Sequence, residues 1–164
     1  ETDEKDGLDT YAKTKGLGEV INQRHLTLRT SVIGPELKEE GNELFNWFMA
    51  QEGEIDGYTQ ALWSGVSSLE LAKVVKWAID NEIKGLYHVT NGKPISKFEL
   101  LSLMKKHTQS KITINPTDAY KADKSFVDSR QEINFKMPSY DEMVFNMVQL
   151  IKAEQHLYSH YNIQ

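Results

Sequence analysis

A predicted helix followed by an apolar, β-rich run is the feature that most constrains the fold of this chain. Residues 25–33 are rich in Leu, Thr, Val and Ile, and the run breaks at Gly34-Pro35, a dipeptide typical of loops. Residues 11–19 precede it and are predicted to be helical. A helix that leads into a strand and a Gly-Pro loop is typical of an α/β crossover unit. Ligands of open α/β sheets bind at the carboxyl ends of the strands, which here is the region of Gly34.

Tyr11 and Lys15 lie four residues apart in the predicted helix, so their side chains project from the same face. The ammonium favours the phenolate and is expected to lower the pKa of the tyrosine from about 10 toward neutral pH. Such a tyrosine can donate a proton to a carbonyl oxygen while hydride reaches the carbon. The spacing alone is not selective, because Tyr120 and Lys124 repeat it in a segment that reads as a loop. The alternative is a surface tyrosine beside a solvated lysine.

Three further helices are predicted from Ser-x-x-Glu sequences, in which each serine and glutamate cap the first turn reciprocally. The capping pairs are Ser67 with Glu70, Ser96 with Glu99, and Ser139 with Glu142. In the first of these helices the predicted buried stripe consists of Ala72, Val75, Ala78 and Ile79. A short strand is predicted at 85–89 and another at 112–114, ending at Asn115-Pro116, after which residues 117–138 read as mostly loop.

Charge and cysteine content exclude several classes of function. The 24 acidic and 19 basic residues are interspersed and give a net charge of −5, which argues against a nucleic-acid interface. No apolar run approaches the roughly 18 residues of a membrane span. The sequence has no cysteine, so disulfides, thiolate metal sites and a cysteine nucleophile are excluded. No leader-like region is visible, and we expect a cytoplasmic protein.

Two arginines and three histidines are candidate site residues. His156 and His160 have helical spacing but no third ligand, so no metal site is expected. His88 lies within a short apolar strand and is interpreted as a satisfied core or edge histidine. Arg29 lies inside an apolar strand, where a charge needs a partner, and either a structural ion pair or a place near a cofactor satisfies that need. Arg130 follows a loop-like segment, and its guanidinium suits a pyrophosphate group.

Several of these segments together resemble the second half of an extended short-chain dehydrogenase/reductase, most similar to the dTDP-4-dehydrorhamnose reductase-like sugar-nucleotide enzymes. The resemblance covers nearly the whole chain and is carried by YAKTKGLGE (11–19), LTLRTSVIGPEL (26–37), YTQALWSGVSSLELAKVVKWAI (58–79), GLYHVTNGKPISKFELLSLM (85–104) and KSFVDSR (124–130). It implies an α/β fold that forms the C-terminal part of a Rossmann-like enzyme, with helices and short strands of the substrate-binding region. Residues 1–35 would be the last part of the Rossmann-like domain, and residues 36–164 mainly the substrate-binding region.

The resemblance also implies roles for individual residues. Tyr11 matches the general acid/base toward the C4 carbonyl or hydroxyl of the sugar. Lys15 matches the lysine that hydrogen-bonds the nicotinamide ribose and lowers the tyrosine pKa. Gly34 and Pro35 match a turn that passes the nicotinamide, so the predicted cofactor contacts are Tyr11, Lys15, Gly34 and Pro35. The candidates for nucleotide-sugar binding are Asn46, Trp63 and Arg130.

The sequence contains no Gly-x-Gly-x-x-Gly or Gly-x-x-Gly-x-x-Gly motif, which the family uses to bind the dinucleotide pyrophosphate. We therefore expect the N-terminal half, and with it NAD(P) binding, to be absent from these residues, and the isolated piece to be inactive. The alternatives are a non-catalytic regulatory or scaffolding subunit of the same fold, or a sugar-nucleotide epimerase or dehydratase. An exposed sheet edge or apolar face is expected to cause homodimerisation or marginal stability.

Overall fold

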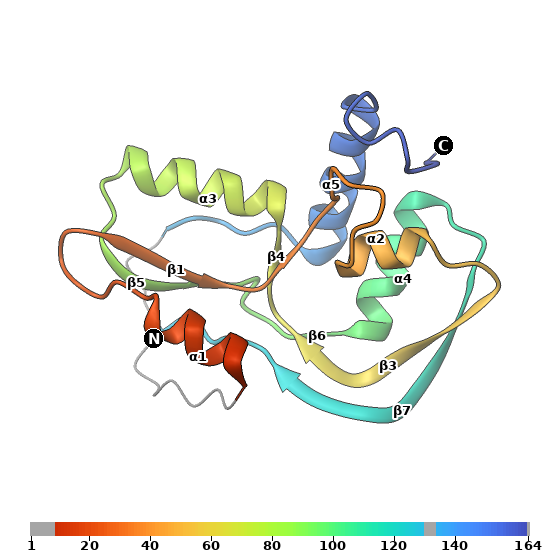
Figure 1. The fold of residues 1–164 in the computed structure, drawn as a ribbon, viewed down its shortest axis with the longest axis horizontal. Coiled ribbons are helices and arrows are strands. Elements are labelled where there is room, and N and C mark those ends of the chain that lie inside the picture. Colours follow the sequence, from red (N-terminus) through yellow and green to blue (C-terminus); the bar gives the residue numbers. More distant parts are fainter. Residues whose placement is uncertain (1–8, 130–133, 164) are drawn as a thin grey trace.

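The computed structural model describes residues 9–129 and 134–163 (Figure 1). Its elements in chain order are α1 (Thr10–Leu17), β1 (Leu26–Thr30), β2 (Val32–Ile33), α2 (Leu44–Met49), β3 (Glu54–Trp63), β4 (Val66–Ser67), α3 (Ser68–Asp80), β5 (Gly85–Val89), β6 (Ile95–Ser96), α4 (Lys97–Thr108), β7 (Thr113–Lys124) and α5 (Tyr140–Ala153). Helices and parallel strand pairs confirm the predicted α/β class.

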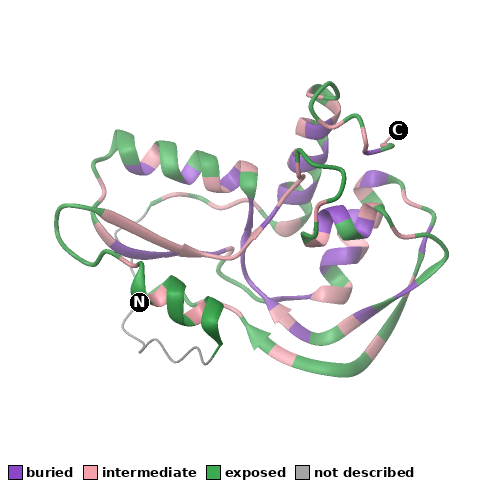
Figure 2. Ribbon diagram, in the orientation of Figure 1, coloured by how far each residue is buried: buried purple, intermediate pink, exposed green. Residues whose placement is uncertain are grey.

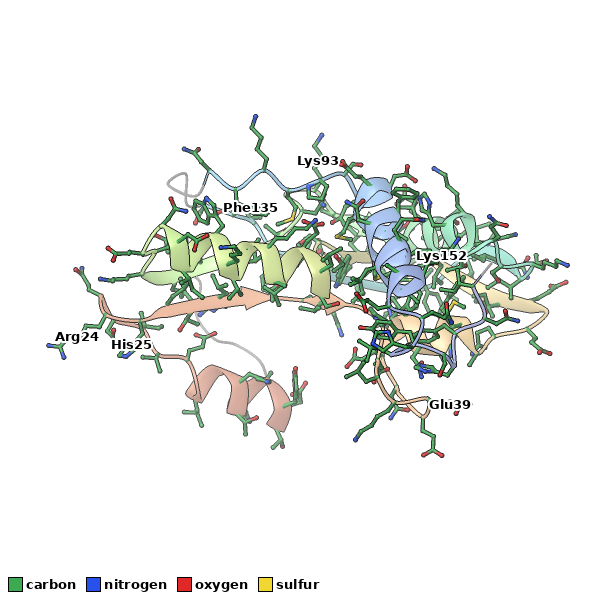
Figure 3. All side chains as sticks on the ribbon, turned by 90° about the horizontal axis from the view of Figure 1, so that it is seen from above. Arg24, His25, Glu39, Lys93, Phe135 and Lys152 are labelled. Carbon is green, nitrogen blue, oxygen red and sulfur yellow. The ribbon has the colours of Figure 1, made fainter. Side chains whose placement is uncertain are left out.

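The predicted crossover unit is present in one part of the molecule. β1 and β5 pair in parallel, with Leu26 opposite Gly85 and Thr30 opposite Val89. α3 lies on one side of this pair and α1 on the other (Figures 1 and 3). β2 and β4 form a second, short parallel pair directly after β1. The pairing of β1 with β5 joins the first 35 residues to a strand from much later in the chain. The domain boundary at residue 35 stays a prediction.

A three-stranded sheet has the strand order β6-β3-β7 and lies beside α2 and α4 (Figure 1). β3 and β7 run in parallel from the pair Glu54–Thr113 to the pair Trp63–Lys124, with a register shift after Tyr58. The predicted loop after Asn115 was therefore wrong for residues 117–124. The strand continues through Pro116 because β7, among the described residues, pairs only with β3 and is an edge strand. A proline is tolerated there, since its missing N–H faces away from the ladder.

The three predicted serine N-caps are confirmed. Ser67, Ser96 and Ser139 each accept a hydrogen bond from the backbone N–H three residues on, and Ser96 with Glu99 forms the complete capping box. Ser67 differs because its own N–H donates to Met143 Sδ at 3.1 Å. The Glu70 carboxylate pairs instead with Lys73, at 2.7 Å. The methionine thus joins the start of α3 to α5.

The predicted buried stripe of α3 was only partly right. Of the four predicted residues only Ala78 is buried; Ala72 is exposed, and Val75 and Ile79 are 39% and 70% exposed. Val74, which was not predicted, is buried. Ser67, Glu70, Val74 and Ala78, three or four residues apart, form the buried face, so α3 is rotated from the phase that its apolar residues suggested. Val75 and Ile79 lie on the exposed face of α3, which agrees with the expectation of an exposed apolar face. Dimerisation through this face stays a prediction.

The hydrophobic core lies where α4 packs against β3 on one side and against α5 on the other, and there Figure 2 shows most of the buried chain. α5 contributes its buried face, and α2 adds two aromatic rings. The fully buried side chains of these two helices include Phe45, Phe48, Met143, Val144, Met147 and Ile151. By contrast, none of the 8 residues of α1 is buried. The core therefore holds the three-stranded sheet in place, whereas α1 is held by other contacts.

None of the helices in the described part of the chain is both long and apolar enough to span a membrane.

Candidate active site

α1 presents Tyr11 and Lys15 together, as the sequence predicts. Asp9 caps the helix by accepting a hydrogen bond from the Ala12 N–H at 2.7 Å. The Lys15 Nζ lies 5.6 Å from the centroid of the Tyr11 ring, so the two side chains share one face of the helix. Tyr11 is 71% exposed and lines a cleft. The phenol is thus accessible, with a cation beside it.

Two contacts just beyond α1 hold the helix against β1. Arg29 Nε and Nη2 donate to Glu19 Oε1 and Oε2 at 2.7 and 2.9 Å, which is a bidentate ion pair. The Thr27 hydroxyl donates to the Val20 carbonyl at 2.7 Å. Because α1 itself buries no residue, these contacts set where Tyr11 lies relative to the strand.

The structure supports a structural role for Arg29 and for His88. Both side chains of the Arg29–Glu19 pair are largely buried, at 17% and 15% exposure. His88 is buried and contacts the Val127 carbonyl through Nδ1 at 2.8 Å. A carbonyl only accepts, so Nδ1 carries the proton and the lone pair of Nε2 faces Arg29 Nη1, 3.5 Å away. The interpretation of His88 as a core histidine is confirmed, and the ion-pair alternative for Arg29 is the one observed.

A cleft of about 600 Å³ opens at the carboxyl ends of β1 and β2. We call it the Tyr11 cleft; residues from four separate parts of the chain line it, among them Tyr11, Ser31, Gly34, Pro35, Ser68 and Phe126. The cleft therefore brings the predicted general acid together with the predicted Gly-Pro turn. Its position matches the rule that ligands of α/β sheets bind beyond the strand ends.

Gly34 has a structural reason to be glycine. A Cβ at this position would collide with the Ser68 side chain, at the first residue of α3. The missing side chain lets the end of β2 approach the start of α3 closely. Gly34 thus shapes the wall of the Tyr11 cleft, and its predicted contact with a nicotinamide stays a prediction.

The three predicted substrate residues lie in different environments. Asn46 is buried, and its Nδ2 donates to the carbonyls of Glu39 and Gly41 at 3.0 and 2.7 Å, which ties down the loop that carries Glu39 (Figure 3). Trp63 is buried, and its Nε1 donates to Ser31 Oγ at 2.6 Å. Trp63 lines a hollow beside the Tyr11 cleft. Arg130 lies outside the described residues. The substrate roles of all three stay predictions.

That neighbouring hollow contains residues that the sequence analysis missed. It measures about 270 Å³ and is lined by Trp63, Lys97, Tyr120 and Lys124, among others, and we call it the lysine hollow. Ser31, Val32, Glu43 and Lys124 line both it and the Tyr11 cleft, so the two cavities are adjacent. The signal that would have found it is the alternation Tyr120-x-Ala122-x-Lys124, which places three side chains on one face of a strand.

The described part of the chain contains no group of three His, Asp or Glu side chains that could bind a metal ion. Besides the carboxylates of Glu36 and Glu43 and the ammonium of Lys124, the polar groups that line the Tyr11 cleft are hydroxyls, one phenol and backbone groups. Such a donor set suits an organic ligand that carries hydroxyl or carbonyl oxygens.

Comparison with known proteins finds matches among solved structures but not among family models or curated sequences. No family model matches the sequence. No curated protein matches it either. Among solved structures, the chain resembles the dTDP-4-dehydrorhamnose reductase of Bacillus anthracis in complex with NADP, with a TM-score of 0.67 and 21% identity over 88% of this chain and 53% of that one. The corresponding enzyme of Clostridium acetobutylicum gives a TM-score of 0.62 and 17% identity, over 77% of this chain and 49% of that one.

A different activity occurs among the similar structures. The UDP-N-acetylglucosamine 4-epimerase of Methanobrevibacter ruminantium, in complex with UDP-N-acetylmuramic acid, gives a TM-score of 0.57 and 18% identity, over 79% of this chain and 46% of that one. The chain thus spans about half the length of the structures it matches. These likenesses show that the chain shares the α/β fold of the matching part of these enzyme structures, in agreement with the predicted fold class.

Proposed function

We propose that this chain forms the substrate side and the proton-donating side of an NAD(P)-dependent sugar-nucleotide reductase, with a 4-keto sugar as substrate. The single observation that carries the proposal is the Tyr11 cleft. It places an exposed phenol, paired with a lysine on the same helix face, at the carboxyl ends of two parallel strands. The fold shared with two dTDP-4-dehydrorhamnose reductases supports the choice of substrate class.

In this proposal Tyr11 donates its phenolic proton to the C4 oxygen of the sugar as that carbon is reduced. The Lys15 cation, beside the ring, stabilises the phenolate that remains. NAD(P)H, when bound, supplies the hydride. Proton donation by a positioned side chain accelerates such reactions by about 10²–10⁴-fold.

The residues of the Tyr11 cleft fit the nicotinamide end of such a cofactor. The cleft begins where β1 and β2 end, and the Thr30 and Ser31 residues in its wall carry hydroxyls for a ribose or an amide. The Gly-rich turn that binds pyrophosphate has no counterpart in the printed sequence. We therefore expect the 164 residues alone to bind NAD(P)H weakly and to need a dinucleotide-binding segment for turnover.

Epimerisation is the second candidate function, because UDP-N-acetylglucosamine 4-epimerases share the fold over a similar part of the chain. The same tyrosine would then remove and return a proton at C4 oxygen. The two functions differ in their cofactor balance. A reductase consumes one NAD(P)H for each sugar, whereas an epimerase regenerates its cofactor.

The test uses the natural polypeptide that contains this sequence, assayed for NADPH oxidation with a dTDP-4-keto sugar. Tyr11→Phe is expected to lower kcat by about 10²–10⁴-fold. Lys15→Met is expected to lower it as well, while Lys13→Met is the matched control, since Lys13 is exposed on the same helix but not on the Tyr11 face. Equal activity of Tyr11→Phe and wild type would refute the proposal. Absence of any turnover in the wild type would favour the regulatory or scaffolding alternative.

A further inference from the structure

The segment that follows α5, residues 154–163, reaches a loop that borders the Tyr11 cleft. Figures 1 and 3 show this segment beside the 36–43 loop, which leads from the Gly34-Pro35 turn into α2. Tyr161 joins the two. It is 2% exposed, and its hydroxyl oxygen accepts a hydrogen bond from the Glu36 backbone N–H at 2.9 Å. The contact connects residues that are 125 positions apart in the sequence.

Aromatic packing holds the ring of Tyr161 in one orientation. The ring meets the fully buried Phe45 of α2 edge to face, with the centroids 5.4 Å apart and the planes at 80°. It also stacks on the Tyr158 ring, with centroids 6.2 Å apart. Both geometries are preferred ones for aromatic pairs. Burial raises the pKa of the Tyr161 hydroxyl, so the phenol stays neutral at physiological pH.

The 36–43 loop is closed on itself, so a contact at one residue positions the whole loop. Glu36 Oε2 accepts a hydrogen bond from the Glu43 N–H at 2.8 Å, which joins the two ends of the loop. A Cβ on Gly41 would collide with the Glu36 carboxylate, so the glycine leaves the room that this carboxylate occupies. Asn46 ties the middle of the loop to α2 through its two carbonyl contacts. Glu36 is thus both the residue that closes the loop and the residue that Tyr161 holds.

Both ends of this loop form part of the wall of the Tyr11 cleft. Glu36 and Glu43 line the cleft, together with the Gly34-Pro35 turn that precedes them. Tyr161 is not among the described residues that line it. Any effect of Tyr161 on a ligand in the cleft is therefore transmitted by Glu36. A shift of Glu36 would move two carboxylates and the adjoining turn.

We propose that Tyr161 is a positioning residue for the Tyr11 cleft. Its hydroxyl holds Glu36, and through Glu36 the 36–43 loop, in the place that a ligand of the cleft requires. The identity of that ligand as a nucleotide sugar rests on the proposed function, whereas the coupling of Tyr161 to the loop does not. In the described part of the chain Tyr161 contacts neither Tyr11 nor Lys15, so it should affect binding and not the transfer of the proton.

Hydrogen exchange of the folded chain tests the coupling without any ligand. Tyr161→Phe keeps the ring and removes only the acceptor for the Glu36 N–H. We expect the Glu36 amide to exchange about tenfold faster, the effect of one lost neutral hydrogen bond. The Glu43 amide is the informative one, because its own acceptor, the Glu36 carboxylate, is untouched. It should exchange faster only if the loop as a whole has loosened, while amides of α3 should not change.

Tyr158→Phe is the matched control. It removes a tyrosine hydroxyl from the same segment and leaves the ring stack with Tyr161 in place. Within the described residues the Tyr158 hydroxyl makes no hydrogen bond to the loop, and the Glu36 N–H donates to Tyr161 instead. The Glu36 and Glu43 amides should therefore exchange at wild-type rates in this variant.

Steady-state kinetics of the natural polypeptide that contains this sequence test the positioning role. With NADPH and a dTDP-4-keto sugar, Tyr161→Phe should raise KM for the sugar by up to about tenfold and leave kcat unchanged. A residue that served folding alone would lower the active fraction, and thus kcat, without changing KM. Tyr11→Phe should show the opposite pattern, a loss in kcat.

Three results would overturn the inference. They are a Glu43 amide that exchanges at the wild-type rate in Tyr161→Phe, an equal acceleration in Tyr158→Phe, and a fall in kcat at unchanged KM. Absence of turnover in wild type would count against the proposed function only, because the exchange rate of the Glu43 amide decides the coupling by itself.

Discussion

Glu19→Gln should destabilise the chain and loosen the helix that carries Tyr11. The bidentate pair with Arg29 consists of contacts of 2.7 and 2.9 Å between side chains that are only 17% and 15% exposed. Breaking a fully buried pair costs about 3–5 kcal/mol, and breaking an exposed one about 0.2–1 kcal/mol. This pair lies between those limits, so we expect a loss of about 2 kcal/mol. For a chain of this size that corresponds to a fall in Tm of about 4–8 °C.

The matched control is an ion pair of equal length but different burial. Lys76 and Asp80 are also 2.7 Å apart, yet their side chains are 77% and 55% exposed. Asp80→Asn should therefore cost no more than about 0.5 kcal/mol. Both variants are measured by urea unfolding at neutral pH, and the double variant Glu19→Gln/Arg29→Gln should lose less than the sum of its single variants.

Hydrogen exchange gives a local readout of the same change. Because none of the residues of α1 is buried, the Glu19–Arg29 pair is a main contact between this helix and β1. Amides of α1 should exchange faster in Glu19→Gln, while those of α5 should not. A stability loss as small as that of Asp80→Asn, with unchanged exchange in α1, would refute the reasoning.

Three further predictions concern charge and close packing. The pKa of Lys97 is lowered in the folded state, so between that pKa and the ordinary lysine value the unfolded chain binds more protons than the folded chain. The free energy of unfolding should therefore rise with pH through this window. Urea unfolding from about pH 7 to 10 should show this rise in wild type, and Lys97→Gln should lack the contribution of Lys97 to it. Hydrogen bonds from the Ser96 N–H and hydroxyl lower the pKa of Glu99. The carboxylate therefore contributes to the free energy of unfolding above the ordinary glutamate pKa, and this contribution is lost as the pH falls through the lower folded value. Glu99→Gln should make the free energy of unfolding less dependent on pH below about pH 5, and an unchanged dependence would contradict this prediction. Gly34→Ala should cost about 1–3 kcal/mol through collision with the Ser68 side chain, and Gly34→Ala/Ser68→Gly should recover part of that loss in the same unfolding assay.

The sequence predicted best those features that depend on local chemistry. The N-caps at Ser67, Ser96 and Ser139 form as expected, because capping involves only neighbouring residues. Tyr11 and Lys15 share a face for the same reason, since helical spacing alone determines it. The fold class followed from the order of helix, strand and Gly-Pro loop, supported by a resemblance to known enzymes.

Features that depend on distant partners were predicted poorly. The sequence predicts the start of β7 as a strand but residues 117–124 as a loop, because their polar side chains and the preceding Pro116 lack a strand signature. Pairing with β3, about 60 residues earlier in the chain, makes these residues a strand. The phase of α3 was misjudged because contacts with α5, including Met143, determine which face is buried. The lysine hollow could not be predicted, because Lys97 and Lys124 meet only through the order of three strands.

The most direct test of the central claim, that this chain serves keto reduction at a sugar nucleotide, is the transfer of a labelled hydride. The natural polypeptide that contains this sequence is incubated with NADPH deuterated at the transferable C4 position and a dTDP-4-keto sugar, and the product is analysed by mass spectrometry. We predict one deuterium at C4 of the sugar for each NADPH oxidised, with Tyr11→Phe slowing label transfer by about 10²–10⁴-fold. A sugar product without deuterium, or label transfer that is unaffected in Tyr11→Phe, would contradict the claim.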